Sequence, residues 1–223
     1  MKKIVSYSLF GNSPRYTVNA FVNVELCKQF YPDWICRIYH DHSVPSNILN
    51  KLKEKNIELI SVDGKHHYRR MWRFYAYDDA DIFISRDIDS HITEREKSAV
   101  DDWLNCDKKL HIMRDHPHHR NKIQAGMFGL KQSNKLKDLK NKCLVYAASN
   151  TNHLSMDEKF LDEIYPIYTN DMIVHDNNNH HKDKTNNWSK DIEYTDKDGQ
   201  FVGRPQYPPS INTIMFKQYE NLQ

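Results

Sequence analysis

Short apolar segments alternate with amphipathic ones through the first half of this sequence. Segments 3–11, 34–41, 57–63 and 81–87 are rich in Ile, Val, Phe and Tyr, and helix-like stretches separate them. Strand and helix patterns in this order predict an α/β chain with a mostly parallel central sheet flanked by helices. Such sheets bind ligands beyond the carboxyl ends of their strands.

Helix signals fill the gaps between the strands and continue after them. Ser13 precedes a helix with Pro14 in its first turn, and Thr93 with Glu96 has the pattern of a capping box. The expected helices cover 13–30, 43–56, 68–79, 93–105, 134–149 and 156–166, and two more strands are expected at 109–115 and 123–130. The spacing of apolar residues thus predicts one continuous α/β domain.

Composition changes near the end of the chain. From about residue 175 to 199 the sequence is rich in Asn, His, Lys and Asp and poor in apolar residues, which is typical of a long loop. We therefore expect a catalytic domain over 1–175 and a loop-rich C-terminal extension over 176–223. The extension is open to two interpretations. In the first, the tail DGQFVGRPQYPPS folds back over the ligand cleft and the Asn- and His-rich loop before it acts as a lid; in the second, the loop is a plain disordered insertion.

Charge and cysteine usage exclude several function classes. The chain of 223 residues has 32 basic and 30 acidic residues and a formal charge of +2, without the one-sided field of a nucleic-acid or membrane-surface binder. Its four cysteines have neither zinc-site spacing nor the density of a disulfide scaffold, so we interpret them as reduced thiols. No segment has the length and apolarity of a signal or transmembrane helix. We expect no nucleic-acid partner and no integral membrane segment.

Two aspartates, Asp87 and Asp89, stand one residue apart at the end of the strand 81–87. Side chains two apart on an extended segment point the same way, and the repulsion between paired carboxylates is relieved by a divalent cation. Mg²⁺ or Mn²⁺ carrying a diphosphate fits such a pair. In the alternative, Asp87 pairs with Arg86 or Arg73 while Asp89 begins the next loop.

The residues around this pair resemble a known family. The sequence SRDIDS, preceded by MWRF and followed by TERE, is similar to the DxD region of GT-A-fold glycosyltransferases, in particular the small sugar transferases of bacterial and large-virus surface-glycan clusters. HIMRDHPHH, IQAGMFG, MDEKFLDEIYP and VHD follow in the order typical of that group, so the resemblance covers residues 1 to about 176.

The resemblance implies a GT-A (Rossmann-like) fold and a hexosyltransferase. Such an enzyme uses Mn²⁺ or Mg²⁺ to move a sugar from a nucleotide sugar, with a UDP-sugar favoured, to a glycan or other hydroxyl acceptor. It would serve polysaccharide biosynthesis in the cytoplasm, or in the host cytoplasm if the gene is viral. Independently, the first turn lacks G-x-G-x-x-G and a P-loop, which argues against a dinucleotide enzyme or a P-loop NTPase.

Metal ligands follow from the same resemblance. Asp89 matches the direct metal ligand, and Asp87 matches the acid that contacts the ribose or sugar, with a place in the metal shell. His175, in VHD, is similar to the late histidine that completes the metal site in glycogenin-like transferases.

The nucleotide site is assigned in the same way. Tyr7 would border the base, Asp41 would meet the uracil or ribose, and Arg73 is the basic residue expected near the nucleotide or Asp87. A core aromatic at Tyr7 and a turn cap at Asp41 are the competing interpretations.

Residues for the sugar and the acceptor come from three further segments. Asp115 ends a strand, and the resemblance puts it and His116 beside the donor sugar or the acceptor. Ala125 and Gly126 would let the backbone approach the sugar, although AGM stands where two glycines are expected. Asp157 resembles an acid that holds sugar hydroxyls, and Asp157 and Asp115 are the candidate catalytic bases. The alternative role of Asp157 is a helix N-terminal acid.

Two other functions stay open on the sequence alone. A metal phosphohydrolase would use RDID and VHD as a two-metal site and need no sugar acceptor. A non-catalytic glycan- or nucleotide-binding module would bind sugar without Asp87 and Asp89. The anomeric outcome of a transfer is not determined by the sequence.

Overall fold

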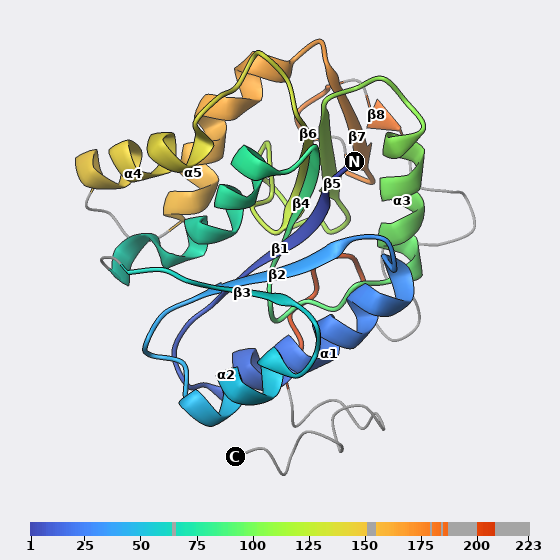
Figure 1. The fold of residues 1–223 in the computed structure, drawn as a ribbon. Helices are drawn as coiled ribbons and strands as arrows, with labels where there is room; N and C mark the ends of the chain where they lie inside the picture. Colours follow the sequence, from blue (N-terminus) through green and yellow to red (C-terminus); the bar gives the residue numbers. More distant parts are fainter. Residues whose placement is uncertain (64–65, 151–154, 179, 184, 187–199, 208–223) are drawn as a thin grey trace.

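The computed structural model describes residues 1–63, 66–150, 155–178, 180–183, 185–186 and 200–207 (Figure 1). Its described strands form one sheet in the order β3-β2-β1-β4-β6-β5-β7-β8. They are β1 (Lys3–Leu9), β2 (Ile35–His40), β3 (Glu58–Ser61), β4 (Ile82–Arg86), β5 (Leu110–Arg114), β6 (Met127–Lys131), β7 (Met172–Asp176) and β8 (Thr185–Asn186). β6 runs antiparallel to its neighbours β4 and β5, and the other described pairs are parallel. The predicted α/β architecture with a mostly parallel sheet is confirmed.

Helices cover both faces of this sheet. They are α1 (Pro14–Phe30), α2 (Ser46–Lys53), η1 (His66–Asp79), α3 (Glu94–Leu104), α4 (Leu139–Ser149), α5 (Met156–Ile164) and the short η2 (Tyr165–Tyr168). Side chains of α1, α2 and α3 pack on one face of the sheet, and those of η1, α4 and α5 pack on the other (Figure 1).

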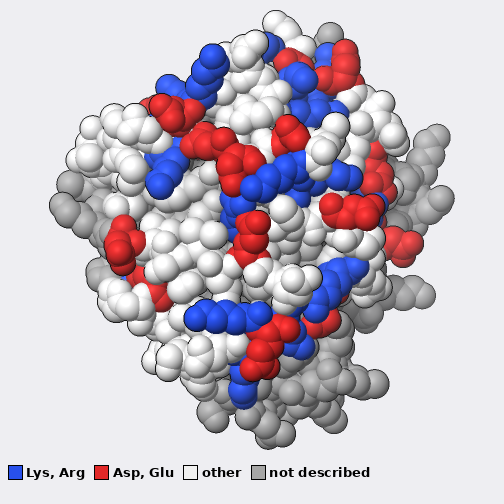
Figure 2. All heavy atoms as spheres, viewed as in Figure 1, with Lys and Arg blue, Asp and Glu red and all other residues white. Residues whose placement is uncertain are grey.

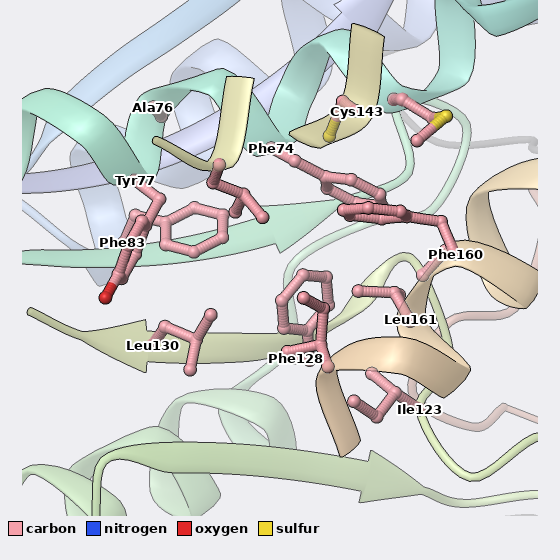
Figure 3. Packing of buried hydrophobic residues seen from close by; sticks show 14 of the residues in the cluster. Phe74, Ala76, Tyr77, Phe83, Ile123, Phe128, Leu130, Cys143, Phe160 and Leu161 are labelled. Carbon is pink, nitrogen blue, oxygen red and sulfur yellow. The ribbon is translucent and has the colours of Figure 1, made fainter. Parts of the chain in front are cut away.

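Aromatic packing joins η1 and α5 to the middle of the sheet. The Phe74 ring of η1 lies 6.2 Å from the Phe160 ring of α5 and 5.4 Å from the Phe128 ring of β6 (Figure 3). Phe83 of β4 in turn lies 5.6 Å from Phe128, edge to face. Such pairs stabilise a core by roughly 0.5–1.5 kcal/mol beyond the area that they bury. η1 and α5, which both contribute to the cleft described below, are therefore fixed by one core.

Several local expectations differ from the structure. Residues 68–79 form a 3₁₀ helix, and Tyr68 has non-helical angles. The strand expected at 123–130 begins only at Met127, because residues 124–127 make a turn in which the Met127 amide donates to the Gln124 carbonyl at 2.9 Å. Strands β7 and β8 were not expected at all, and β8 joins the sheet edge from within the expected C-terminal extension.

The surface carries both signs of charge. Lys and Arg side chains alternate with Asp and Glu over the face seen in Figure 2, in keeping with the small net charge of +2. Within the described ranges, no helix combines the length and the apolarity that crossing a membrane requires. Most of the predicted lid, residues 176–199, lies outside the described residues, and the division at residue 175 stays a prediction.

Candidate active site

A cleft of about 330 Å³ opens at the carboxyl ends of β1 and β4. Ser8 and Phe10 line it from the end of β1, and Asp87 and Asp89 line it from the turn after β4. This is the edge at which open α/β sheets bind ligands, so the predicted location is where the structure has its cleft. A volume of this size accommodates a small organic ligand.

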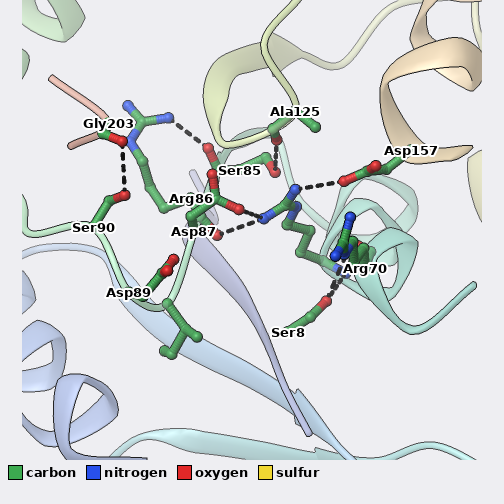
Figure 4. A network of polar contacts seen from close by, with 12 residues as sticks. Ser8, Arg70, Ser85, Arg86, Asp87, Asp89, Ser90, Ala125, Asp157 and Gly203 are labelled. Carbon is green, nitrogen blue, oxygen red and sulfur yellow. Dashed lines mark hydrogen bonds and ion pairs between the residues drawn. The ribbon is translucent and has the colours of Figure 1, made fainter. Parts of the chain in front are cut away.

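Asp87 is held by a buried arginine. Nη1 of Arg73, on η1, pairs with Oδ1 of Asp87, and its Nη2 donates to Oδ2 of Asp157 at 2.9 Å (Figure 4). Burial lowers the pKa of Arg73, but the charges of Asp87 and Asp157 outweigh burial and raise that pKa above its ordinary value. The cation of Arg73 therefore joins carboxylates from two separate elements at one side of the cleft.

Gly126 lies directly against the other oxygen of Asp87. A Cβ at this position would overlap Oδ2 and the carboxyl carbon of Asp87. Ala125 precedes it in the same turn, and its carbonyl accepts a hydrogen bond from Ser85 Oγ at 2.7 Å (Figure 4). Ala125 and Gly126, the small residues predicted to let the backbone approach the sugar, thus line the cleft. The Asp87 carboxylate lies directly against Gly126.

Asp89 is mostly buried and bound to a second arginine. Nε of Arg15 donates to Oδ2 of Asp89 at 2.7 Å, and Nη2 of the same guanidinium pairs with the same oxygen. Burial, followed by the charge of Asp87, raises the pKa of Asp89, and Arg15 offsets part of that rise. The two aspartates are thus close enough to repel each other, as expected from their spacing.

The residues present fit a divalent cation. Asp87 and Asp89 offer hard carboxylate oxygens at one cleft, and the destabilised negative charge on Asp89 is the condition that a cation relieves. Among the described residues, no group of three His, Cys, Asp or Glu side chains is arranged to hold a metal. The fit is therefore to an ion that takes two protein carboxylates and completes its shell with water and phosphate oxygens, as Mg²⁺ and Mn²⁺ do.

His175 is not brought to this cleft. It lies on β7, where its Nε2 contacts Asp102 Oδ2 of α3 at 3.1 Å and its Nδ1 contacts His111 Nε2 at 3.1 Å. Burial lowers the pKa of His175 despite the neighbouring carboxylate of Asp102. Successive side chains of a strand point to opposite faces, and the face that His175 takes is the one covered by α3. The structure thus separates the predicted third ligand from Asp87 and Asp89.

Asp115 is also separated from the cleft, because a network encloses it. Its carboxylate accepts hydrogen bonds from Arg95 at 2.8 and 2.9 Å, from Asn177 at 2.9 Å and from the Val202 amide at 2.9 Å. The side chain is fully buried and is not among those that line the cleft. The His116 ring lies 4.2 Å from the Phe201 ring, tilted by 30°, and does not line the cleft. With these four hydrogen bonds the Asp115 carboxylate holds together the segments that carry Arg95, Asn177 and Val202.

Tyr7 and Asp41 match the alternative interpretations. Tyr7 is fully buried in the core beneath α1, where burial, followed by the charges of nearby cysteines, raises its pKa. Asp41 accepts hydrogen bonds from the Ser43 amide at 3.0 Å and the Ser43 hydroxyl at 2.5 Å, and it pairs with Arg69 at 2.6 Å. It thus caps the turn after β2, and neither residue lines the cleft.

Several cleft residues were missed by sequence reasoning. Arg15, Arg70, His119 and Glu158 line the cleft. Gly203 and Pro205 also line it, and they belong to the tail for which the sequence left open a position over the cleft. Glu158 follows Asp157 in the first turn of α5, where Asn121 and Ser155 act to lower the pKa of its carboxyl group. Burial, together with the charges of Asp157 and Asp87, raises the pKa of Glu158. Its position next to a predicted site residue was the one signal that could have pointed to it.

Comparisons with known proteins address the fold. No protein-family model and no curated protein matches the sequence. Among solved structures, TarS of S. aureus in complex with UDP matches with a TM-score of 0.51 and 14% identity, over 79% of this chain and 58% of that one. An active-site mutant of LgtC matches with a TM-score of 0.52 and 11% identity, over 99% of this chain and 94% of that one.

A third structure is glucosyl-3-phosphoglycerate synthase of Mycobacterium tuberculosis with Mn²⁺, UDP-glucose and phosphoglyceric acid. It matches with a TM-score of 0.50 and 10% identity, over 78% of this chain and 68% of that one. The matched region spans little more than half of the TarS chain. The protein has a GT-A glycosyltransferase fold, as the resemblance implied.

Proposed function

We propose that the protein is a metal-dependent hexosyltransferase that moves a sugar from a nucleotide sugar, with a UDP-sugar favoured, to a hydroxyl of a glycan or another acceptor. The observation that carries this proposal is the pair Asp87 and Asp89 at the cleft of a GT-A fold. The UDP of the TarS complex and the UDP-glucose and Mn²⁺ of the synthase complex support the donor class and the metal.

Asp87 and Asp89 would hold the cation, Mn²⁺ or Mg²⁺, which when bound neutralises charge on a diphosphate leaving group. Arg73 keeps Asp87 in place from the buried side of the cleft. Arg70 is exposed at the cleft, and no ion pair involving it is found within the described ranges. Its guanidinium is therefore the group suited to bind a phosphate oxygen of the donor.

Phe10 and Tyr16 form the aromatic side of the cleft. Their rings are stacked with centroids 6.5 Å apart, and both lie near the carboxyl end of β1. Aromatic rings can stack on any nucleobase, so this side of the cleft suits the base of the nucleotide sugar. The nucleotide would then extend from the aromatic pair toward Asp87 and Asp89.

The acceptor hydroxyl must lose its proton as the new bond to the sugar forms, and a carboxylate at the start of α5 can take it. Asp157 already forms an ion pair with Arg73, with 2.9 Å between Oδ2 of Asp157 and Nη2 of Arg73. The groups beside Glu158 that favour its charged form are the neutral side chains of Asn121 and Ser155. We therefore assign the role of base to Glu158 and the role of holding Arg73, and through it Asp87, to Asp157.

The test is calorimetric titration of UDP and GDP into the protein, with and without Mn²⁺. We expect one nucleotide to bind only with Mn²⁺, and Asp89→Asn to weaken that binding by about tenfold or more, a change of about 1.4 kcal/mol. Asp33→Asn, on an exposed turn before β2, is the matched control and should bind as the wild type does. Absence of nucleotide binding under any metal condition would reject the transferase and favour a phosphohydrolase or a sugar-binding module.

A further inference from the structure

The C-terminal segment of residues 200–207, here called the strap, lies along the turn that carries Asp89. The Gln206 amide donates to the Asp89 carbonyl at 2.7 Å, and Ser90 forms an antiparallel bridge with Pro205. The Ser90 hydroxyl also donates to the Gly203 carbonyl at 3.1 Å (Figure 4). Gly203 and Pro205 line the cleft beside the aspartates. The strap and the Asp89 turn are thus joined through their backbones.

Arg15 joins the same two segments through side chains. It stands in the first turn of α1, and its Nε donates to Asp89 Oδ2 at 2.7 Å. Its Nη1 donates to the Tyr207 hydroxyl at 2.9 Å, and its guanidinium lies over the Tyr207 ring at 4.3 Å. One planar cation therefore contacts a proposed metal ligand and the end of the strap at the same time.

The contacts of Arg15 with Asp89 fall on a single oxygen. Both Nε and Nη2 approach Oδ2, and among the described residues no contact of Arg15 with Oδ1 is found. The Asp89 carbonyl is fixed separately by Gln206. With its main chain and one carboxylate oxygen held, Asp89 can present the other oxygen in one direction. A ligand oxygen that is fixed before the ion arrives costs less to order on binding.

α1 holds the strap at a further point. Asn19, one turn after Arg15, donates to the Gln206 carbonyl at 3.1 Å and to the Arg15 carbonyl at 2.5 Å. Val202, at the other end of the strap, donates its amide to the buried Asp115 at 2.9 Å. The strap is therefore fixed at both ends, and Arg15 and Asn19 set its position relative to Asp89.

We propose that Arg15 is a positioning residue of the metal site: it holds Asp89 so that Oδ1 faces the cation, and through Tyr207 it couples cation binding to docking of the strap. The inference rests on the proposed function, since it presupposes the cation at Asp87 and Asp89. Coupling of this kind is reciprocal, so a bound cation stabilises the docked strap by the same factor by which the docked strap strengthens cation binding.

A purely electrostatic role predicts the opposite result. A guanidinium near the site repels a divalent cation, so a charge-only role makes Arg15→Gln bind Mn²⁺ more tightly. If Arg15 has a positioning role, Arg15→Gln and Arg15→Lys should both bind Mn²⁺ more weakly. Lys keeps the charge, but its single ammonium group cannot contact Asp89 and Tyr207 with the geometry of the planar guanidinium. The two variants together therefore separate geometry from charge.

The experiment measures Mn²⁺ affinity without nucleotide, by electron paramagnetic resonance of free Mn²⁺, together with hydrogen exchange of the Gln206 amide. We expect Arg15→Gln and Arg15→Lys to weaken Mn²⁺ binding about tenfold, and Tyr207→Phe about threefold. Mn²⁺ should slow exchange of the Gln206 amide in the wild type and slow it less in each variant. Arg120→Gln, at an exposed position, is the matched control and should match the wild type.

The outcomes separate this inference from the proposed function. Wild-type protein that binds no Mn²⁺ would overturn the metal-dependent function and the inference with it. Wild-type binding that Arg15→Gln and Tyr207→Phe leave unchanged or strengthen would overturn the inference alone. Tyr207→Phe removes one hydroxyl near the surface, so it still gives an answer if the Arg15 variants fail to fold. Loss of UDP binding with unchanged Mn²⁺ affinity would make Arg15 a phosphate ligand and would also reject the positioning role.

Discussion

Gly126 shows how an absent side chain gives the cleft its shape. A Cβ at this position would overlap the Asp87 carboxylate, which Arg73 holds from its other side. We predict that Gly126→Ala displaces Asp87 and weakens Mn²⁺-dependent nucleotide binding about tenfold, with little effect on thermal stability. Calorimetry and thermal unfolding measure the two quantities.

Gly129 is the comparison for Gly126 in the same segment. A Cβ there would lie 2.9 Å from atoms of Ile84 and Trp103 in the core, and neither of these residues lines the cleft. Overpacking of this kind costs roughly 1–3 kcal/mol. Gly129→Ala should therefore lower stability and leave the nucleotide affinity of the folded protein unchanged. A Gly126→Ala variant that loses stability and keeps its affinity would contradict the assignment of Asp87.

Glu158 determines how activity should depend on pH. Its pKa is raised by burial and by Asp157 and Asp87, so the carboxylate loses its charge at a higher pH than an ordinary glutamate. A base must be deprotonated to act, so the rate should fall as the pH drops through that raised pKa. We predict that Glu158→Gln reduces turnover by about a hundredfold or more, removes this acidic fall in rate and keeps UDP affinity.

The measurement for Glu158 is release of nucleoside diphosphate from a panel of nucleotide sugars over a range of pH. Glu163→Gln, exposed on the same helix, is the control and should keep both the rate and its pH dependence. If Glu158→Gln retains the wild-type profile, then the base lies elsewhere and Asp157 becomes the next candidate.

Among the elements, α3 shows how a tertiary contact overrides a local pattern. Thr93 caps the helix as expected, since its hydroxyl accepts from the Glu96 amide at 3.1 Å. In a full capping box the Glu96 carboxylate would accept a hydrogen bond from the Thr93 amide. Here it accepts from the buried Arg86 side chain instead, at 2.6 Å. A buried guanidinium left without a counter-charge would be more costly than an unfilled cap. The same contact explains why Arg86 does not pair with Asp87.

The cap of α3 has a measurable effect on stability. We predict that Thr93→Ala lowers the free energy of unfolding by about 1 kcal/mol, because one amide at the helix start loses its acceptor. Thr93→Ser keeps the hydroxyl and should lie close to the wild type. Urea unfolding of the three proteins measures the difference. Equal stabilities of the Ala and Ser variants would show that this cap does not stabilise α3.

For the whole molecule, the order of strands and helices was enough to predict where the cleft lies. The carboxyl ends of the parallel strands β1 and β4 meet at one edge, so Asp87 and Asp89 were correctly expected there. The sequence could not show how deeply each strand-end residue is buried. Asp115 and His175 both stand at or near strand ends, yet other elements enclose them.

The contacts that hold the strap could not be predicted from the sequence. Its hydrogen bonds to Asn19 and Asp115 span 187 and 87 positions in the sequence, and no local pattern signals contacts of that range. Arg15 looked like an ordinary first-turn residue of a helix for the same reason, since its partners Asp89 and Tyr207 are distant in the chain. Local periodicity predicts elements, whereas these contacts depend on the final packing.

The reversed direction of β6 has a consequence for how enzymes of this shape can diversify. Because β6 begins at the edge where β5 ends, the chain between them, residues 115–126, stays at that edge of the sheet and does not cross the sheet through a helix. This loop contributes His119 and Gly126 to the cleft, while β5 and β6 pair directly with each other in the sheet. Insertions or exchanges within it can therefore alter substrate choice over evolution, or in the laboratory by grafting, on an unchanged scaffold.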